Sequence, residues 1–152
     1  MTIEEKLAEM GIELPTPPKP VAAYVPAVQT GNLVFLSGQL PIKDGRVMST
    51  GAVPIQCSIE NAREGAKLTA INILAQLKAH LGSLDRVKRI VRINGFVQSE
   101  NGWYKQPEVL NGASEFLAEV FGEKGKHTRI AIGVSELPLN ATMQIDAIVE
   151  VE

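Results

Sequence analysis

The feature that most constrains the fold is a long segment of helical periodicity in the middle of the chain. Apolar side chains recur at helical spacing from residue 58 to residue 81, with Ser58 suited to cap the start and Gly82 to end it. A second helix is predicted from Pro107 to Phe121, because Pro107 fits a first helical turn and an apolar stripe follows it. Two helices of this kind need a common apolar surface to cover.

That surface is predicted by segments in which apolar and polar residues alternate, as they do in half-buried strands. One runs over residues 32–38 and is followed by a turn at 43–46 and a return strand. A second covers residues 87–97, and the last two cover 129–138 and 142–152, which we expect to form a tight antiparallel pair. The expected apolar faces are Val91, Ile93 and Val97, then Ile130, Ile132 and Val134, and then Met143, Ile145, Ala147, Val149 and Val151.

The order of strands, long helix, strand, helix and final strand pair predicts an α+β fold, with one mixed sheet and two helices stacked on one face. Residues 1–20 are interpreted as an N-terminal helix, capped by Thr2 and stopped at Gly11, followed by a proline-rich connector. Residues 21–152 are then expected to form one domain.

Charge and cysteine content exclude several function classes. Fifteen basic and 17 acidic residues give a net charge of -2, so no global attraction to nucleic acid or anionic lipid is expected. No apolar run is long enough to span a membrane. The single Cys57 excludes an intramolecular disulfide and a cysteine-built zinc site, and His80 and His127 are too few for a metal cluster. We therefore expect a cytoplasmic protein without a metal.

Arg129 is the candidate binding residue. Period-two alternation puts its side chain on the same face as Ala131 and Gly133, which leaves a shallow space beside a planar double donor. Arginine binds a carboxylate through two parallel hydrogen bonds. In a tight strand pair, Gln144 and Asp146 would bracket Arg129. Two alternatives remain open: an ordinary surface arginine, and a structural ion pair with Asp146.

Three blocks of the sequence carry a resemblance to a known family. AAYVPAVQTGNLVFLSGQLP, VLNGASEFLAEVF and TRIAIGVSELPLNATMQIDAIVEV resemble, in order and spacing, the RidA family, also called YjgF and historically labelled endoribonuclease L-PSP. The resemblance spans about residues 20 to 152. The N-terminal helix and its connector are similar to those of a longer subgroup within that family.

The resemblance implies a chorismate-mutase-like fold assembled as a homotrimer, with ligand sites in the clefts between subunits. It implies hydrolysis of reactive enamines and imines, such as 2-aminoacrylate, to a 2-keto acid and ammonia without a cofactor. The partner is then a small carboxylate-bearing metabolite. Arg129 is similar to the family arginine that binds the substrate carboxylate, and Tyr24, Ser37 and Asn111 match positions that line the cleft. Gly38 lies beside Ser37, where backbone groups reach the ligand.

The sequence departs from the family pattern at two positions. Gln144 stands where the family usually has a glutamate proposed to orient or activate water, and Ala131 replaces a common cysteine. An amide can hydrogen-bond a water but cannot exchange its proton in acid–base work. The first hypothesis is therefore a deaminase that uses Arg129 and Gln144, and the second is a non-catalytic, regulatory binder of small keto or amino acids. A third, RNA cleavage, rests on the historical label alone.

Overall fold

The computed structural model describes residues 1–17 and 23–152. Its helices are α1 (Ile3–Glu9), α2 (Ile59–Leu81) and α3 (Gln106–Phe121). Its strands are β1 (Ala27–Thr30), β2 (Leu33–Gln39), β3 (Ile42–Lys43), β4 (Arg46–Val47), β5 (Val87–Gln98), β6 (Thr128–Val134) and β7 (Met143–Val151). Short 3-10 turns complete the list: η1 (Leu84–Arg86), η2 (Gly122–Gly125) and η3 (Pro138–Asn140). Of these strands, β1 is not among the predicted ones.

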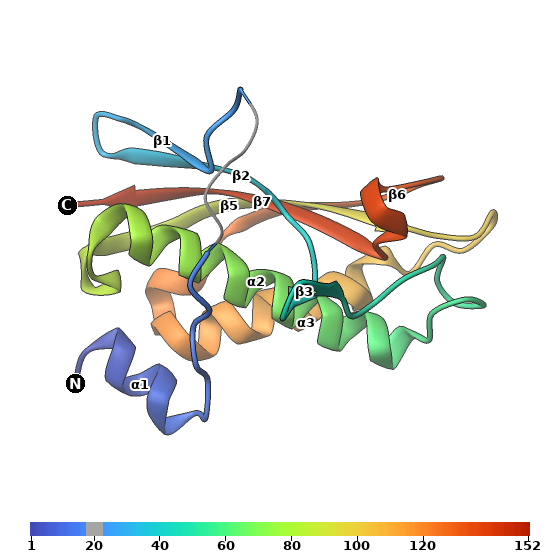
Figure 1. Ribbon diagram of the computed structural model, residues 1–152, viewed down its shortest axis with the longest axis horizontal. Coiled ribbons are helices and arrows are strands. Elements are labelled where there is room, and N and C mark those ends of the chain that lie inside the picture. The colour runs from blue at the N-terminus through green and yellow to red at the C-terminus, as the bar shows by residue number, and fades with distance from the viewer. Residues whose placement is uncertain (18–22) are drawn as a thin grey trace.

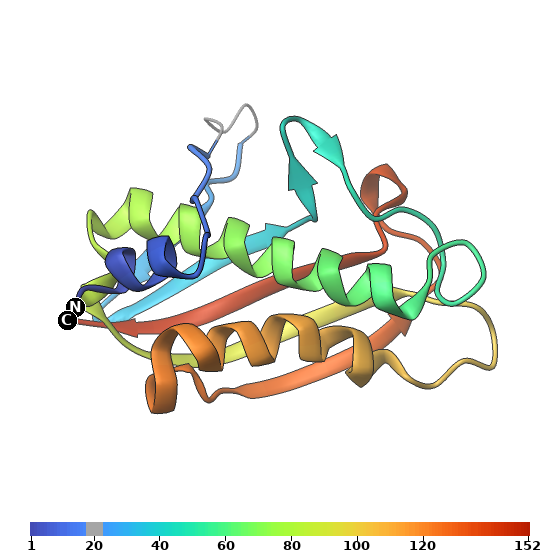
Figure 2. The same ribbon diagram turned by 90° about the horizontal axis from the view of Figure 1, so that it is seen from below.

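Two long helices lie side by side on one face of a five-stranded sheet (Figure 1, Figure 2). The strand order is β1-β2-β7-β5-β6. β5 and β6 run parallel, and the other neighbouring strands of this sheet run antiparallel. The predicted α+β class, with a mixed sheet and two helices on one face, is confirmed. We call the opposite side of the sheet the helix-free face, because no described helix covers it.

Local signals in the sequence set the ends of the long helices. The Ser58 hydroxyl accepts a hydrogen bond from the Asn61 backbone N–H at 3.0 Å, which satisfies one of the unpaired donors at the start of α2. α2 ends at Gly82, where φ is 85°, a conformation that favours glycine. α3 has Pro107 in its first turn and ends at Gly122. Both predicted helices are confirmed.

The core lies between the helices and the sheet. Along β7 burial alternates strictly, and the five residues predicted for its apolar face are all buried against the helices. On β5, Ile93 and Val97 are buried as predicted, but Val91 is not. A register shift between Ile90 and Arg92 breaks the alternation there and turns Ile90 into the core instead.

The predicted pairing of the last two strands is wrong. β6 is an edge strand that pairs with β5 alone, and β7 lies between β2 and β5. The reason is the β5-α3-β6 crossover, because a strand that follows such a helix returns parallel to the first strand. β7 then fills the remaining place on the other side of β5.

The predicted apolar face of β6 is also wrong. The parallel register sets Arg129 beside the buried Ile93, so that Arg129 and Ala131 face the helices. Ile130 and Ile132 consequently lie on the helix-free face, and Ile132 is 44% exposed. Alternation identified the strand correctly but could not tell which of its faces is covered.

The N-terminal helix packs onto the domain. Thr2 and Glu5 form a capping box, and Leu7 is 2% exposed within the core cluster. The Ile3 N–H donates to Asp85 Oδ1 at 2.8 Å, which ties α1 to η1. Gly11 follows the helix with φ 75°, as its role as a stop requires. The end of the proline-rich connector and the expected boundary between residues 20 and 21 lie outside the described residues.

Two further observations bear on the class of protein. Within residues 1–17 and 23–152, no helix combines the length and the apolar character that crossing a membrane requires. Cys57 is buried, as expected for a small apolar side chain.

Candidate functional site

Arg129 lies near the start of β6, at the edge of the sheet and under α3. Its neighbour in the parallel register is Ile93 of the core, and this fixes the direction of the side chain toward the helix. The residue is half-buried. Because β6 has no further strand beside it in the described part of the chain, the guanidinium lies where α3 and an open sheet edge meet.

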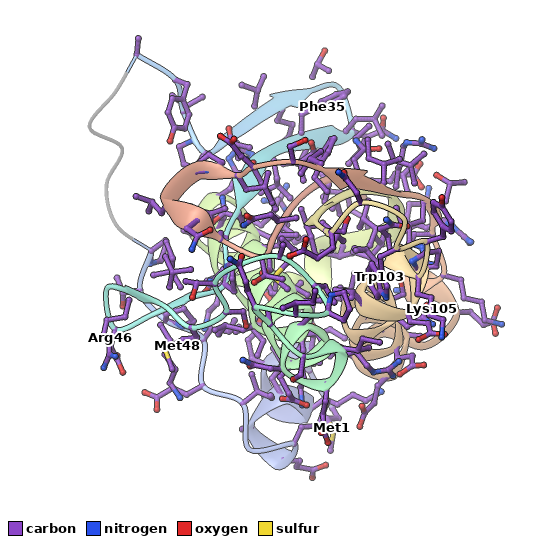
Figure 3. The ribbon with its side chains drawn as sticks, turned by 90° about the vertical axis from the view of Figure 1, so that its right-hand side faces the viewer. Met1, Phe35, Arg46, Met48, Trp103 and Lys105 are labelled. Atoms are coloured by element: carbon purple, nitrogen blue, oxygen red, sulfur yellow. The ribbon has the colours of Figure 1, made fainter. Side chains whose placement is uncertain are left out.

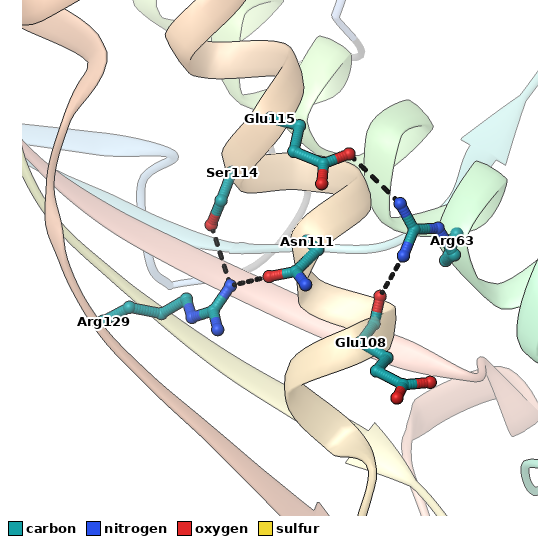
Figure 4. A network of polar contacts seen from close by, with 6 residues as sticks. All are labelled: Arg63, Glu108, Asn111, Ser114, Glu115 and Arg129. Carbon is teal, nitrogen blue, oxygen red and sulfur yellow. Dashed lines mark hydrogen bonds and ion pairs between the residues drawn. The ribbon is translucent and has the colours of Figure 1, made fainter.

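The guanidinium is held by two neutral acceptors from α3. Its Nη1 donates to Asn111 Oδ1 at 2.9 Å and to Ser114 Oγ at 3.1 Å (Figure 4). Asn111 and Ser114 are three residues apart, so they project from the same side of the helix. These two bonds use both protons of Nη1. Nε and Nη2 have no hydrogen-bond partner among the described residues.

His127 extends this network away from the arginine. Its Nδ1 lies 2.6 Å from the Gly125 carbonyl oxygen, and its Nε2 lies 2.9 Å from Ser114 Oγ. A carbonyl can only accept, so Nδ1 carries the proton and the Ser114 hydroxyl donates to Nε2 of a neutral ring. Burial lowers the pKa of His127 and the Arg129 charge lowers it further, against the bond to Gly125, which raises it. The neutral form is therefore favoured.

The space expected beside Ala131 and Gly133 is only partly open. A Cβ at Gly133 would lie 2.7 Å from Gln106 Nε2 and 2.7 Å from Ser99 Oγ. The Gln106 side chain occupies this position and donates to the Trp103 carbonyl at 2.8 Å. A side chain at residue 133 would therefore require the ends of the Gln106 and Ser99 side chains to shift.

Four other predicted site residues come from β2, β7 and the bend before β1. We call them the β2 group: Tyr24, Ser37, Gly38 and Gln144. Ser37 Oγ donates to the Val25 carbonyl at 2.7 Å, and Tyr24, which precedes Val25, is 66% exposed. A Cβ at Gly38 would contact the Gln144 amide. Gly38 and Gln144 therefore lie against each other.

The structure does not bring the β2 group to Arg129. β7 and β5 lie between β2 and β6, and Gln144 faces the helix-free side whereas Arg129 faces the helices. The predicted bracketing of Arg129 by Gln144 and Asp146 is wrong, because it rested on adjacent final strands. Asp146 instead accepts a hydrogen bond from Asn94 Nδ2 at 2.6 Å. A structural ion pair between Arg129 and Asp146 is excluded as well.

Two residues of this network, Ser114 and His127, were not predicted from the sequence to belong to the site. Ser114 and His127 carry no motif, and His127 was considered only as a metal ligand. The available signal was spacing, since Asn111 and Ser114 are both polar and lie off the apolar stripe of α3. In the described ranges 1–17 and 23–152, no group of three or more histidine, cysteine, aspartate or glutamate residues could hold a metal ion.

Comparison with known proteins gives consistent matches along the chain. A family model described as "YjgF/chorismate mutase-like, putative endoribonuclease" matches residues 4–151. Protein TCP17 of Trypanosoma cruzi is 39% identical, over 97% of this chain and 93% of that protein. A 2-iminobutanoate/2-iminopropanoate deaminase of Dermatophagoides farinae is 31% identical, over 93% of this chain and 95% of that protein.

A solved structure matches the whole architecture. The crystal structure of the protein Atu1372 from Agrobacterium tumefaciens, whose function is unknown, superimposes with a TM-score of 0.92 at 45% identity. The match covers 99% of this chain and 94% of that chain, so α1 falls within the shared structure.

Proposed function

The chain belongs to the YjgF/chorismate mutase-like family, and from this membership we propose that it is a RidA-type enamine/imine deaminase. Its substrates would be small 2-imino acids, such as those that form from 2-aminoacrylate. The observation that carries the proposal is that neutral acceptors, and no carboxylate among the described residues, hold the Arg129 guanidinium. The deaminase relative supports the class of reaction.

The free part of the guanidinium matches a carboxylate. With Nη1 bound to Asn111 and Ser114, the remaining N–H groups of Nε and Nη2 point along one edge of the planar group. That edge presents two parallel donors, the geometry in which arginine binds both oxygens of a carboxylate. Partial burial strengthens such a charge-assisted contact relative to one in open water. A substrate carboxylate is thus oriented as well as attracted.

The β2 group completes the site only if two chains contribute to it. In one chain, Gln144 and Arg129 face opposite sides of the sheet. A head-to-tail contact would bring the β2 group of one subunit to the open β6 edge of the next, and three such contacts would close a ring. Exposed apolar side chains on the helix-free face, Val28, Phe35 and Ile132, would be covered in this assembly. We therefore include the homotrimer in the proposal.

The proposed reaction needs a water and no redox partner. Water adds to the C=N carbon of the 2-imino acid, and the resulting carbinolamine loses ammonia to leave the C=O of a 2-keto acid. Arg129 anchors the carboxylate, main-chain groups at Gly38 hold the reacting end, and the Gln144 amide orients the water. The Gln144 amide cannot take a proton. The proton that the attacking water gives up therefore passes, by way of water, to the nitrogen that leaves as ammonia.

Keto-acid release from freshly generated 2-aminoacrylate tests the proposal. Arg129→Ala should lower the catalysed rate, and Arg129→Lys should recover little of it because an ammonium cannot form the double contact. Arg46→Ala is the matched control, since Arg46 is exposed on β4. The assignment fails if Arg129→Ala and the wild-type protein accelerate release equally.

The second candidate is a non-catalytic, regulatory binder of keto or amino acids, and Gln144 is the observation in its favour. Saturable binding of pyruvate without imine hydrolysis, unchanged in Gln144→Glu, would support it. A gain of hydrolysis in Gln144→Glu would instead show that the cleft is a working site lacking an acid–base group. RNA cleavage is supported by the wording of the family description alone. Within this chain His80 contacts Gln29 and His127 contacts Ser114, so the two rings do not share a site.

A further inference from the structure

The hydrogen bonds around Arg129 form a chain with a defined direction. Arg129 Nη1 donates to Ser114 Oγ, the Ser114 hydroxyl donates to His127 Nε2, and His127 Nδ1 donates to the Gly125 carbonyl. Each proton in the chain has one acceptor, which fixes the rotation of the serine hydroxyl. Its lone pairs are thereby left for the arginine.

Two bonds to a single guanidinium nitrogen fix the plane of the group. Both protons of Nη1 lie in that plane. They point at Asn111 Oδ1 and Ser114 Oγ, which lie 2.9 and 3.1 Å from Nη1 (Figure 4). If either acceptor were removed, the group could turn about its Nε–Cζ bond and exchange Nη1 with Nη2. While the group turns, the two parallel donors of the ligand-binding edge are out of position.

The helix that supplies these acceptors is itself anchored. Arg63 of α2 donates to the Glu108 carbonyl of α3 at 3.1 Å and forms an ion pair with Glu115 at 3.1 Å. Glu108 and Glu115 flank Asn111 and Ser114 in the sequence of α3 (Figure 4). The two acceptors therefore project from a helix that is tied on both sides to α2.

We propose that Ser114 and His127 are positioning residues for carboxylate recognition, which rests on the proposed function. His127 accepts the hydroxyl proton of Ser114, and Ser114 holds Nη1, so that Nε and Nη2 form the ligand-binding edge. Neither residue touches the ligand. Arg129 is the charged side chain that acts on the His127 ring, since the neighbouring Glu123 and Lys126 pair with each other at 2.8 Å.

The test combines two measurements on the chain of residues 1–152. Nitrogen-15 NMR of the Arg129 side chain reports whether Nη1 and Nη2 are distinct or exchange, and pyruvate titration reports affinity for a carboxylate. Wild-type protein should show two resolved Nη signals. Ser114→Ala should merge them and weaken pyruvate binding by about three- to tenfold, the effect of one lost hydrogen bond. Ser114→Thr, which keeps the hydroxyl, should restore both.

A variant of His127 separates the His127–Ser114 hydrogen bond from the Ser114–Arg129 hydrogen bond. His127→Phe keeps an aromatic ring but removes the acceptor, and should accelerate the Nη exchange as Ser114→Ala does. Resolved signals together with pyruvate affinity within about twofold of wild type in Ser114→Ala would overturn the inference. If Arg129→Ala binds pyruvate as well as wild type, the proposed function fails instead, while the exchange measurement still decides the role of Ser114.

Discussion

At the scale of single residues, His127 links the polar network to pH. Its folded-state pKa lies below the ordinary value of 6.5, because burial and the Arg129 charge disfavour the imidazolium. The unfolded chain therefore binds more protons than the folded one as pH falls through 6.5 toward the lowered value. Above this window the ring is neutral in both states, so stability is lost on acidification and regained on return to neutral pH.

We predict that the unfolding free energy falls more between about pH 7.5 and about pH 5.5 in the wild type than in His127→Asn. Urea unfolding at the two pH values measures this difference. His80 is present in both proteins, so its titration cancels. Equal pH dependence in the two proteins would show that the His127 pKa is the same in the folded and unfolded chains.

The site was only partly predictable from sequence, and the residues show why. Arg129 and Asn111 were both predicted as binding residues, and in the structure Arg129 Nη1 lies 2.9 Å from Asn111 Oδ1. Gln144 was placed wrongly because its relation to Arg129 depends on strand order, which alternation does not encode. Ser114 and His127 were missed as site residues because Ser114 contacts Arg129, and His127 contacts Ser114, only in three dimensions.

At the scale of elements, the crossing of α2 and α3 depends on one glycine. A Cβ at Gly112 would collide with the Arg63 carbonyl oxygen of α2, which belongs to rigid helix backbone. We predict that Gly112→Ala destabilises the fold by about 1–3 kcal/mol, although alanine has the better helix propensity by about 1 kcal/mol.

Chemical denaturation of Gly112→Ala beside Glu119→Ala measures this effect. Glu119 is exposed on the same helix, so its replacement should change stability by less than about 0.5 kcal/mol. Stabilisation by Gly112→Ala would mean that the helices separate at no cost, contrary to the close crossing.

Elements with strong local signals were predicted well, and those that depend on neighbours were not. α2, α3 and β7 follow from capping residues and periodicity, which belong to the segment itself. β1 is a four-residue strand of mostly exposed side chains that forms by pairing with β2, so its own sequence hardly marks it. The same limit explains the inverted faces of β6.

The N-terminal helix provides a further test at this scale. Leu7 is buried to 2% exposure, so Leu7→Ala should lower the unfolding free energy by about 2–4 kcal/mol. Glu9→Ala, on an exposed position of α1, is the control. A single shifted transition would show that α1 unfolds with the domain. If instead α1 detaches first, the main transition of Leu7→Ala will coincide with that of wild type.

At the scale of the whole molecule, the sheet has one face covered by helices and one left open. Phe35 projects from the helix-free face, away from the helices (Figure 3). Cross-strand pairing sets it between Val28 and Ile148, which makes an apolar row across three strands. Val28 is 53% exposed and Phe35 41%, and large side chains gathered in this way favour association of subunits.

We predict that Phe35→Glu converts a trimer into monomers, because a carboxylate on this face must be desolvated when subunits meet. Light scattering with size-exclusion chromatography should give about three times 16.4 kDa for wild type and about 16.4 kDa for the variant. Ile55→Glu is the control, since Ile55 is 80% exposed in a loop outside the sheet. Pyruvate binding should disappear with the trimer, because the proposed site needs Arg129 of one subunit and Gln144 of the next. A monomeric Phe35→Glu that binds pyruvate normally would place the whole site within one chain.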